Sequence, residues 1–87
     1  MRYRKRPVVI EAVRWQNRKI VCPPGPAWFA DAEAQGVIML AGDTLHIKTL
    51  EGNMRCNVGD WIIKGVLGEL YPCKDEIFLA TYELVGP

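Results

Sequence analysis

Serine is absent from the sequence, histidine occurs once and cysteine three times. Without serine, chemistry on a serine nucleophile is excluded. The cysteines Cys22, Cys56 and Cys73 are odd in number and have no CxxC spacing, a pattern typical of free thiols in a reducing cytoplasm. Zinc sites usually pair ligands about two to four residues apart, whereas these cysteines and His46 are isolated from one another. The sequence therefore predicts no metal, no other cofactor and no enzyme activity.

Long apolar runs are lacking as well. No stretch approaches the ~20 apolar residues of a membrane-spanning helix. The charged N-terminus has no apolar segment of the kind found in signal peptides. With 87 residues, about half of them apolar, the chain is expected to form a single domain over residues 1–87 with a basic lead-in at residues 1–6. These features predict a cytoplasmic protein that does not contact a membrane.

The stretch at residues 45–73 organises the rest of the chain, because it has the pattern of a β-meander. Residues 45–50 alternate between apolar and polar side chains, which is typical of a half-buried strand. A Gly-Asn turn follows, and residues 54–58 form the next predicted strand, with Cys56 among apolar neighbours and expected to be buried. Residues 61–63 are apolar on both faces, which predicts a central strand. Leu70 and Tyr71 begin a fourth strand, which Pro72 is expected to end.

The remaining segments supply one convincing helix and several strands. Gly36 is a typical C-terminal stop for that helix, and Pro26 is well placed at its start. We expect a first strand at residues 7–15, a short extended piece at 20–22, the helix at 26–35, a strand at 37–40, one or two helical turns at 74–80 and a last strand at 81–85. The predicted fold class is α+β: a curved antiparallel β-sheet, or a partly open small β-barrel, with one packed helix.

Three separated stretches carry a family resemblance. They are YRKRPVVIEAVRW at residues 3–15, VGDWIIKGVLGELYPC at 58–73 and KDEIFLATYELV at 74–85. Their combination resembles a family of small uncharacterised bacteriophage and prophage proteins with a PGDYG-like motif. Val58 stands here where the motif has Pro, and Trp61 stands where it has Tyr. The resemblance implies a small, β-rich cytoplasmic protein of phage origin, and it brings no catalytic residues.

One candidate ligand or partner surface consists of Asp60, Trp61 and Tyr71. In the Gly59-Asp60-Trp61 segment, glycine lets a backbone approach closely, aspartate accepts hydrogen bonds and tryptophan stacks on planar rings. The structural alternative, which we favour, is a β-turn in which Gly59 adopts positive φ, Asp60 bonds its own backbone and Trp61 fills the core.

A second candidate surface is the basic segment of Arg2, Arg4, Lys5 and Arg6. Residues 1–19 contain seven basic side chains against one acidic, while residues 20–87 contain four basic against nine acidic. Such a segment can bind a polyanion such as nucleic acid, or it can dock on its own acidic body.

Taken together, these features predict a small phage-encoded accessory protein that acts without catalysis. Its binding surface would act on a host or phage macromolecule, with a protein partner favoured. The alternatives are a small-molecule or nucleotide binder with a groove near Trp61 and Tyr71, and a nucleic-acid binder that uses the basic segment. A homodimer is a further alternative.

Overall fold

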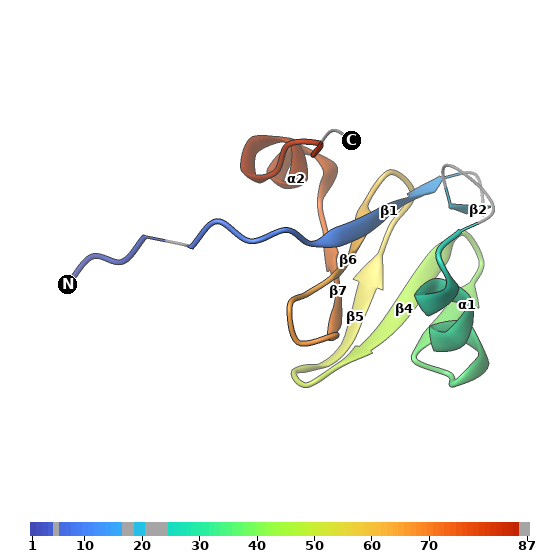
Figure 1. The fold of residues 1–87 in the computed structure, drawn as a ribbon. Helices are drawn as coiled ribbons and strands as arrows, with labels where there is room; N and C mark the ends of the chain where they lie inside the picture. Colours follow the sequence, from blue (N-terminus) through green and yellow to red (C-terminus); the bar gives the residue numbers. More distant parts are fainter. Residues whose placement is uncertain (5, 17–18, 21–24, 86–87) are drawn as a thin grey trace.

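The computed structural model describes residues 1–4, 6–16, 19–20 and 25–85. The strands are β1 (Glu11–Gln16), β2 (Lys19–Ile20), β3 (Ile38–Ala41), β4 (Thr44–Thr49), β5 (Gly52–Cys56), β6 (Trp61–Lys64) and β7 (Leu70–Cys73), and the helices are α1 (Ala27–Ala34) and α2 (Asp75–Thr81). The strands form two antiparallel sheets, in the orders β2-β1-β6-β7 and β3-β4-β5 (Figure 1). The predicted α+β class is confirmed, and within the described ranges the sheets do not close into a barrel.

The single meander predicted over residues 45–73 is wrong, because its strands are divided between the two sheets: β4 and β5 join β3 in the three-stranded sheet, whereas β6 and β7 belong to the four-stranded sheet. In β4, Leu45 and Ile47 are buried while Lys48 is exposed, as the alternating pattern predicts. On β5, Cys56 pairs with Leu45 and is fully buried, so the expected burial of this thiol is confirmed. The turn between the two strands consists of Leu50 and Glu51, and it places Leu50 in solvent. The predicted Gly-Asn turn is therefore wrong, because Gly52 and Asn53 already lie in β5.

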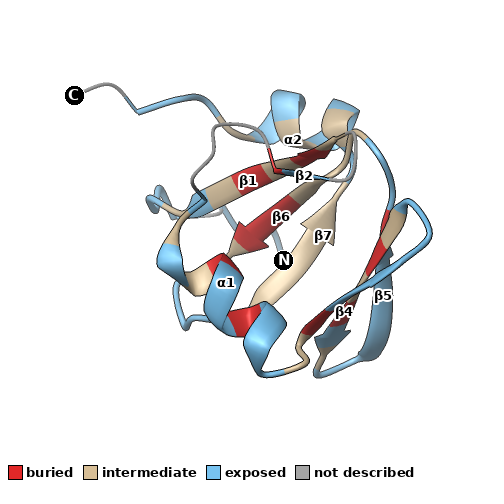
Figure 2. Ribbon diagram, turned by 90° about the vertical axis from the view of Figure 1, so that its right-hand side faces the viewer, coloured by how far each residue is buried: buried red, intermediate tan, exposed pale blue. Residues whose placement is uncertain are grey.

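The strand β6 lies inside the four-stranded sheet, with β1 on one side and β7 on the other. Ile62 and Ile63 are both buried, although their side chains point to opposite faces of the strand. Ile62 belongs to the main core, which also contains Val13 of β1 and Leu45 of β4. Figure 2 shows the buried residues along β1, β6, β4 and α1. The prediction of a central strand covered on both faces is therefore confirmed.

The helix α1 ends as its sequence predicts. Gly36 has a φ of 76°, a conformation that glycine adopts without the penalty of a Cβ atom. Its N–H donates to the carbonyl of Glu33, and the N–H of Val37 donates to the carbonyl of Ala32. These two bonds form a Schellman motif, which satisfies carbonyls that a helix end otherwise leaves free. Phe29 and Ala32 bury the inner face of the helix in the main core.

Several predicted boundaries are wrong. The first strand begins at Glu11 rather than at residue 7, and Val8 and Val9 are exposed in an extended segment that leads away from the body (Figure 1). Pro72 lies within β7 rather than ending the strand. Residues 81–85 form no strand, because Thr81 is the last residue of α2 and residues 82–85 have no regular structure.

Two further expectations concern helices and one short segment. The helical turns predicted at residues 74–80 are present as α2, so the described part of the chain has a second helix packed against the sheet. Of the extended piece predicted at residues 20–22, Ile20 lies in β2 and residues 21 and 22 fall outside the described ranges. Both helices are too short to cross a bilayer, and no other described segment forms a helix that could.

Candidate functional site

The predicted β-turn before β6 is present. Gly59 has a φ of 94°, which favours glycine, and the Asp60 carboxylate accepts a hydrogen bond of 3.0 Å from the backbone N–H of Asn57. The turn is also tied to β1, because the Gly59 N–H donates to the carbonyl of Trp15 over 2.7 Å and the Trp15 N–H donates to the carbonyl of Asp60 over 2.9 Å. The Asp60 side chain therefore has a structural role in this turn.

Trp61 packs beneath α2. Its indole ring stacks on Phe78 with centroids 3.9 Å apart and an angle of 7° between the ring planes. The Arg14 guanidinium lies 5.9 Å from the indole centroid, within the range of a cation–π contact. Trp61 is half-buried and lies outside the main core, so the expectation that it fills that core is wrong. Since Phe78 stacks directly on the ring, little room is left there for a planar ligand.

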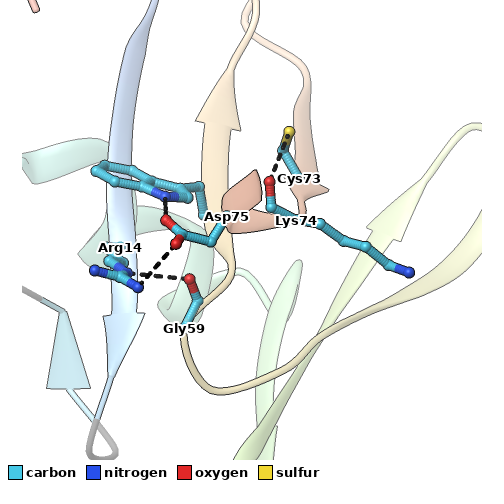
Figure 3. Close-up of polar contacts among 6 residues, drawn as sticks. Arg14, Gly59, Cys73, Lys74 and Asp75 are labelled. Carbon is cyan, nitrogen blue, oxygen red and sulfur yellow. Dashed lines mark hydrogen bonds and ion pairs between the residues drawn. The ribbon is translucent and has the colours of Figure 1, made fainter. Parts of the chain in front are cut away.

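Asp75, the first residue of α2, connects the helix to two strands. Its Oδ1 accepts a 2.8 Å hydrogen bond from Trp61 Nε1, and its Oδ2 lies 3.2 Å from Arg14 Nη2 (Figure 3). Arg14 also donates from Nε to the carbonyl of Gly59 over 3.1 Å. These contacts fix α2 against the face of the four-stranded sheet that points away from the main core. We refer to Arg14, Trp61 and Asp75 as the α2 clamp.

Tyr71 faces the same side of the sheet as Trp61, because it pairs with Ile63, two residues beyond Trp61 on β6. Burial, a hydrogen bond with Tyr82 and nearby charges raise the pKa of Tyr71 to about 12. Tyr82 in turn lies against Phe78 of α2. The structure thus brings Tyr71 and Trp61 to one face and covers that face with α2, while Asp60 stays in its turn. These three residues do not form an open ligand surface.

The basic segment projects from the body. Arg2, Arg4 and Arg6 are exposed, and none forms an ion pair with another described residue, while Lys5 lies outside the described ranges. Figure 1 shows residues 1–4 and 6–10 leading away from the body in extended conformation. We call residues 1–10 the N-terminal arm. The structure therefore does not show the alternative in which the basic segment docks on the acidic body of its own chain.

The described cysteines differ in their surroundings. Burial, followed by the charge of the Asp60 carboxylate, raises the pKa of the Cys56 thiol to about 12, so the thiol stays protonated and unreactive at neutral pH. Cys73 is half-buried at the end of β7, and Cys22 lies outside the described residues. No three His, Cys, Asp or Glu side chains gather as metal ligands in the part of the chain that the structure describes.

An open groove of about 790 Å3 runs between α1, the β4–β5 turn and β7. Its walls are mainly apolar, and charged side chains stand among them. The apolar walls include Trp28, Leu50, Met54 and Leu70; the acidic residues are Asp31, Glu51 and Glu69, and the basic ones are Lys48 and Lys64.

Two residues that line this groove have features that are costly in an isolated protein. Leu50 at the tip of the β4–β5 turn is fully exposed, with 104% relative accessibility. The indole Nε1 of Trp28 is buried without an acceptor among the described residues. A buried donor that lacks a partner costs about 1–3 kcal/mol. An occupant with apolar side chains would cover Leu50, whereas Trp28 Nε1 is already closed off from solvent.

Sequence reasoning missed this groove, except that it named Tyr71, which contributes to the lining. The groove combines residues from three segments, and only the tertiary fold brings those segments together. One local signal was present in the sequence: Leu50 is an apolar residue at the position where an alternating strand gives way to a Gly-Asn turn.

No protein-family model matches the chain, and comparison with curated proteins and with solved structures finds no significant similarity. The resemblance to the phage family with the PGDYG-like motif stays an expectation.

Proposed function

We propose that this protein is a non-enzymatic binding module whose groove holds an extended polypeptide segment of a host or phage macromolecule. The observation that carries the proposal is the groove itself, which is open to solvent, is walled by apolar side chains and has Leu50 fully exposed at its rim. Exposed apolar surface of this kind, bordered by polar residues, is typical of interaction sites.

Charge defines the chemistry of the expected segment. The groove contains three carboxylates and two ammonium groups. One of the two ammonium groups, that of Lys64, already lies 3.9 Å from the carboxylate of Glu11. A segment that carries apolar and basic residues fits this lining. Because Pro72 lacks an N–H, the outer edge of β7 offers few backbone donors, so side-chain contacts should supply most of the affinity.

Selection from a displayed library of random peptides tests the proposal. We expect enriched peptides to combine apolar residues with Lys or Arg. Leu50→Asp should weaken their binding at least ~10-fold, because it places a carboxylate on the apolar rim. The matched control is Leu84→Asp, since Leu84 is 97% exposed and does not line the groove. A library that yields no binders, or binders that Leu50→Asp leaves unaffected, would refute the groove as a peptide site.

A small molecule is a weaker candidate for the same groove. Its volume lies within the ~300–1,000 Å3 of typical ligand pockets. However, the three carboxylates disfavour nucleotides, whose phosphates are negatively charged. A thermal-shift screen with nucleotides distinguishes the two, because a ligand at 100 times its Kd adds about 2.7 kcal/mol of stability.

Nucleic acid is a second candidate partner, favoured by one observation. Arg2, Arg4 and Arg6 are exposed on the arm together with Tyr3, whose ring is available for stacking on a base. Binding of a fluorescent single-stranded oligonucleotide would then fall steeply as salt rises, because phosphate contacts release counterions. Replacing the three arginines with alanine should abolish that binding, whereas peptide binding in the groove would persist.

A further inference from the structure

The N-terminal arm and the groove are complementary surfaces of the same molecule. The arm carries exposed apolar side chains, among them Tyr3 and Val9, which are largely open to solvent, and Val8, which is about half exposed. It also carries Arg2, Arg4 and Arg6, and none of these forms an ion pair with a residue that the structure describes. An extended segment with both apolar and basic residues is the chemistry that the groove fits.

The arm reaches far enough to lie along the groove of another molecule. Ten residues in extended conformation span up to ~33–36 Å. Along that length, Val8 and Val9 would contact apolar walls such as Leu50 and Leu70, and the arginines would approach the groove carboxylates.

The geometry of the arm favours a second molecule over the arm's own body. The arm continues from β1 and points away from the sheets (Figure 1). Docking into the groove of the same chain would require it to turn back near Pro7. Proline fixes φ near −65°, and the residue before a proline, here Arg6, is restricted to extended conformations. Arg6 and Pro7 therefore favour the extended course of the arm, and a reversal would have to be made at residues 8–10.

We propose that two copies of this chain exchange their N-terminal arms, so that the arm of each copy lies in the groove of the other. This inference rests on the proposed function, because it names the segment that the groove holds. The arrangement is isologous: the same two surfaces meet twice around a twofold axis. Each copy contributes one basic, apolar arm and one acidic, apolar groove.

Sedimentation equilibrium of the full chain tests the association. The wild type should show a concentration-dependent dimer. Val9→Asp in the arm and Leu50→Asp in the groove should each shift the protein to monomer, while Leu84→Asp should leave the dimer intact. All three positions are exposed, so the variants are expected to fold, and circular dichroism checks this. A wild type that stays monomeric, or a dimer that neither variant weakens, would overturn the proposal.

Cross-linking shows whether the arm is exchanged between molecules. In a background with Cys22→Ala and Cys73→Ala, one chain carries Val9→Cys and another carries Leu50→Cys, while the native Cys56 stays buried. Mild oxidation of the mixture should give a disulfide-linked heterodimer. A chain with both substitutions that forms only an internal disulfide would overturn exchange, because its arm would then lie in its own groove.

A synthetic peptide of residues 1–10 separates this inference from the proposed function. Binding of the peptide to the groove, lost in Leu50→Asp and kept in Leu84→Asp, supports both. If selected library peptides bind the groove and the arm peptide does not, arm exchange is overturned and the peptide-binding function stands. If no peptide binds, both proposals fall. An arm that binds an oligonucleotide in a monomeric chain would likewise overturn the exchange.

Discussion

The α2 clamp makes a quantitative prediction for Asp75→Ala. This substitution removes the acceptor of the 2.8 Å bond from Trp61 Nε1 and the 3.2 Å partner of Arg14. A hydrogen bond to a charged group contributes about 1.5–3 kcal/mol. The ion pair adds at most about 1 kcal/mol, because both side chains are about one-third exposed. We therefore expect the free energy of unfolding to fall by about 2–3 kcal/mol.

Glu76→Ala is the matched control for this prediction. Glu76 also lies in the first turn of α2, so both substitutions remove an acidic group near the positive end of the helix dipole, worth about 0.3–1 kcal/mol. Glu76 takes no part in the clamp. Urea denaturation followed by circular dichroism should therefore show a clearly larger loss for Asp75→Ala. In a domain of this size the clamp variant should melt roughly 8–24 °C lower than the wild type.

A double-mutant cycle isolates the bond between Asp75 and Trp61. Trp61→Phe removes the indole N–H but keeps an aromatic ring against Phe78. If the bond holds α2 in place, the two substitutions together should cost about 1–2 kcal/mol less than the sum of their separate effects. Additive effects within ~0.3 kcal/mol, or equal losses for Asp75→Ala and Glu76→Ala, would refute the role that we assign to the clamp.

Three further predictions follow from the turn, the buried thiol and the arm. Gly59→Ala should lower the free energy of unfolding by about 1–2 kcal/mol in urea denaturation, because a φ of 94° is strained for a residue with a Cβ atom; an unchanged midpoint would contradict this. Because the pKa of Cys56 is raised in the folded protein, the unfolded state loses the thiol proton first as the pH rises. The free energy of unfolding should therefore fall between about pH 9 and 12, by up to ~1.4 kcal/mol per pH unit, and Cys56→Ala should flatten this pH profile. Replacing Arg2, Arg4 and Arg6 with alanine should shift the melting temperature of dilute protein by only a few degrees, because these side chains are exposed; a variant that does not fold would show that they are structural.

The sequence predicted those elements whose local pattern and tertiary surroundings agree. In β4 the alternation of Leu45 and Ile47 with polar residues matches a strand with one buried face. Gly36 ends α1 because the Schellman geometry needs positive φ at that position. In both places the local preference and the packing favour the same structure, so the prediction needed no knowledge of distant residues.

The predicted strands at the two ends of the chain failed because a strand needs a partner. Pairing of β1 with β6 stops at Glu11 and Lys64, since the chain turns after Lys64, and Val8 and Val9 have no strand beside them. At the other end, residues 82–85 have strand propensity, but Tyr82 packs against Phe78 of α2 instead. Strand propensity depends on such contacts more than on the residue itself.

The candidate site was harder to predict, because it depends on which apolar residues remain uncovered. The sequence indicated Trp61 and Tyr71 as aromatic residues of a candidate ligand surface. In the structure, α2 covers the face of the sheet on which they lie. No pattern in residues 74–80 shows that Asp75 will contact Trp61 and Arg14. The open apolar surface lies instead at Leu50, which the alternating pattern placed at the end of a strand and the structure places in a turn.

Covering one sheet on both faces limits where this small protein can bind a partner. The main core and α2 take the two faces of the four-stranded sheet, with Ile62 on one side and Trp61 on the other. The groove and the N-terminal arm are two surfaces that still carry exposed apolar side chains. One is concave and acidic, while the other is extended and basic. Since exposed apolar surface is costly in water, a contact that covers both features at once is favoured over one that covers either alone. Arm exchange between two copies achieves this without any further partner.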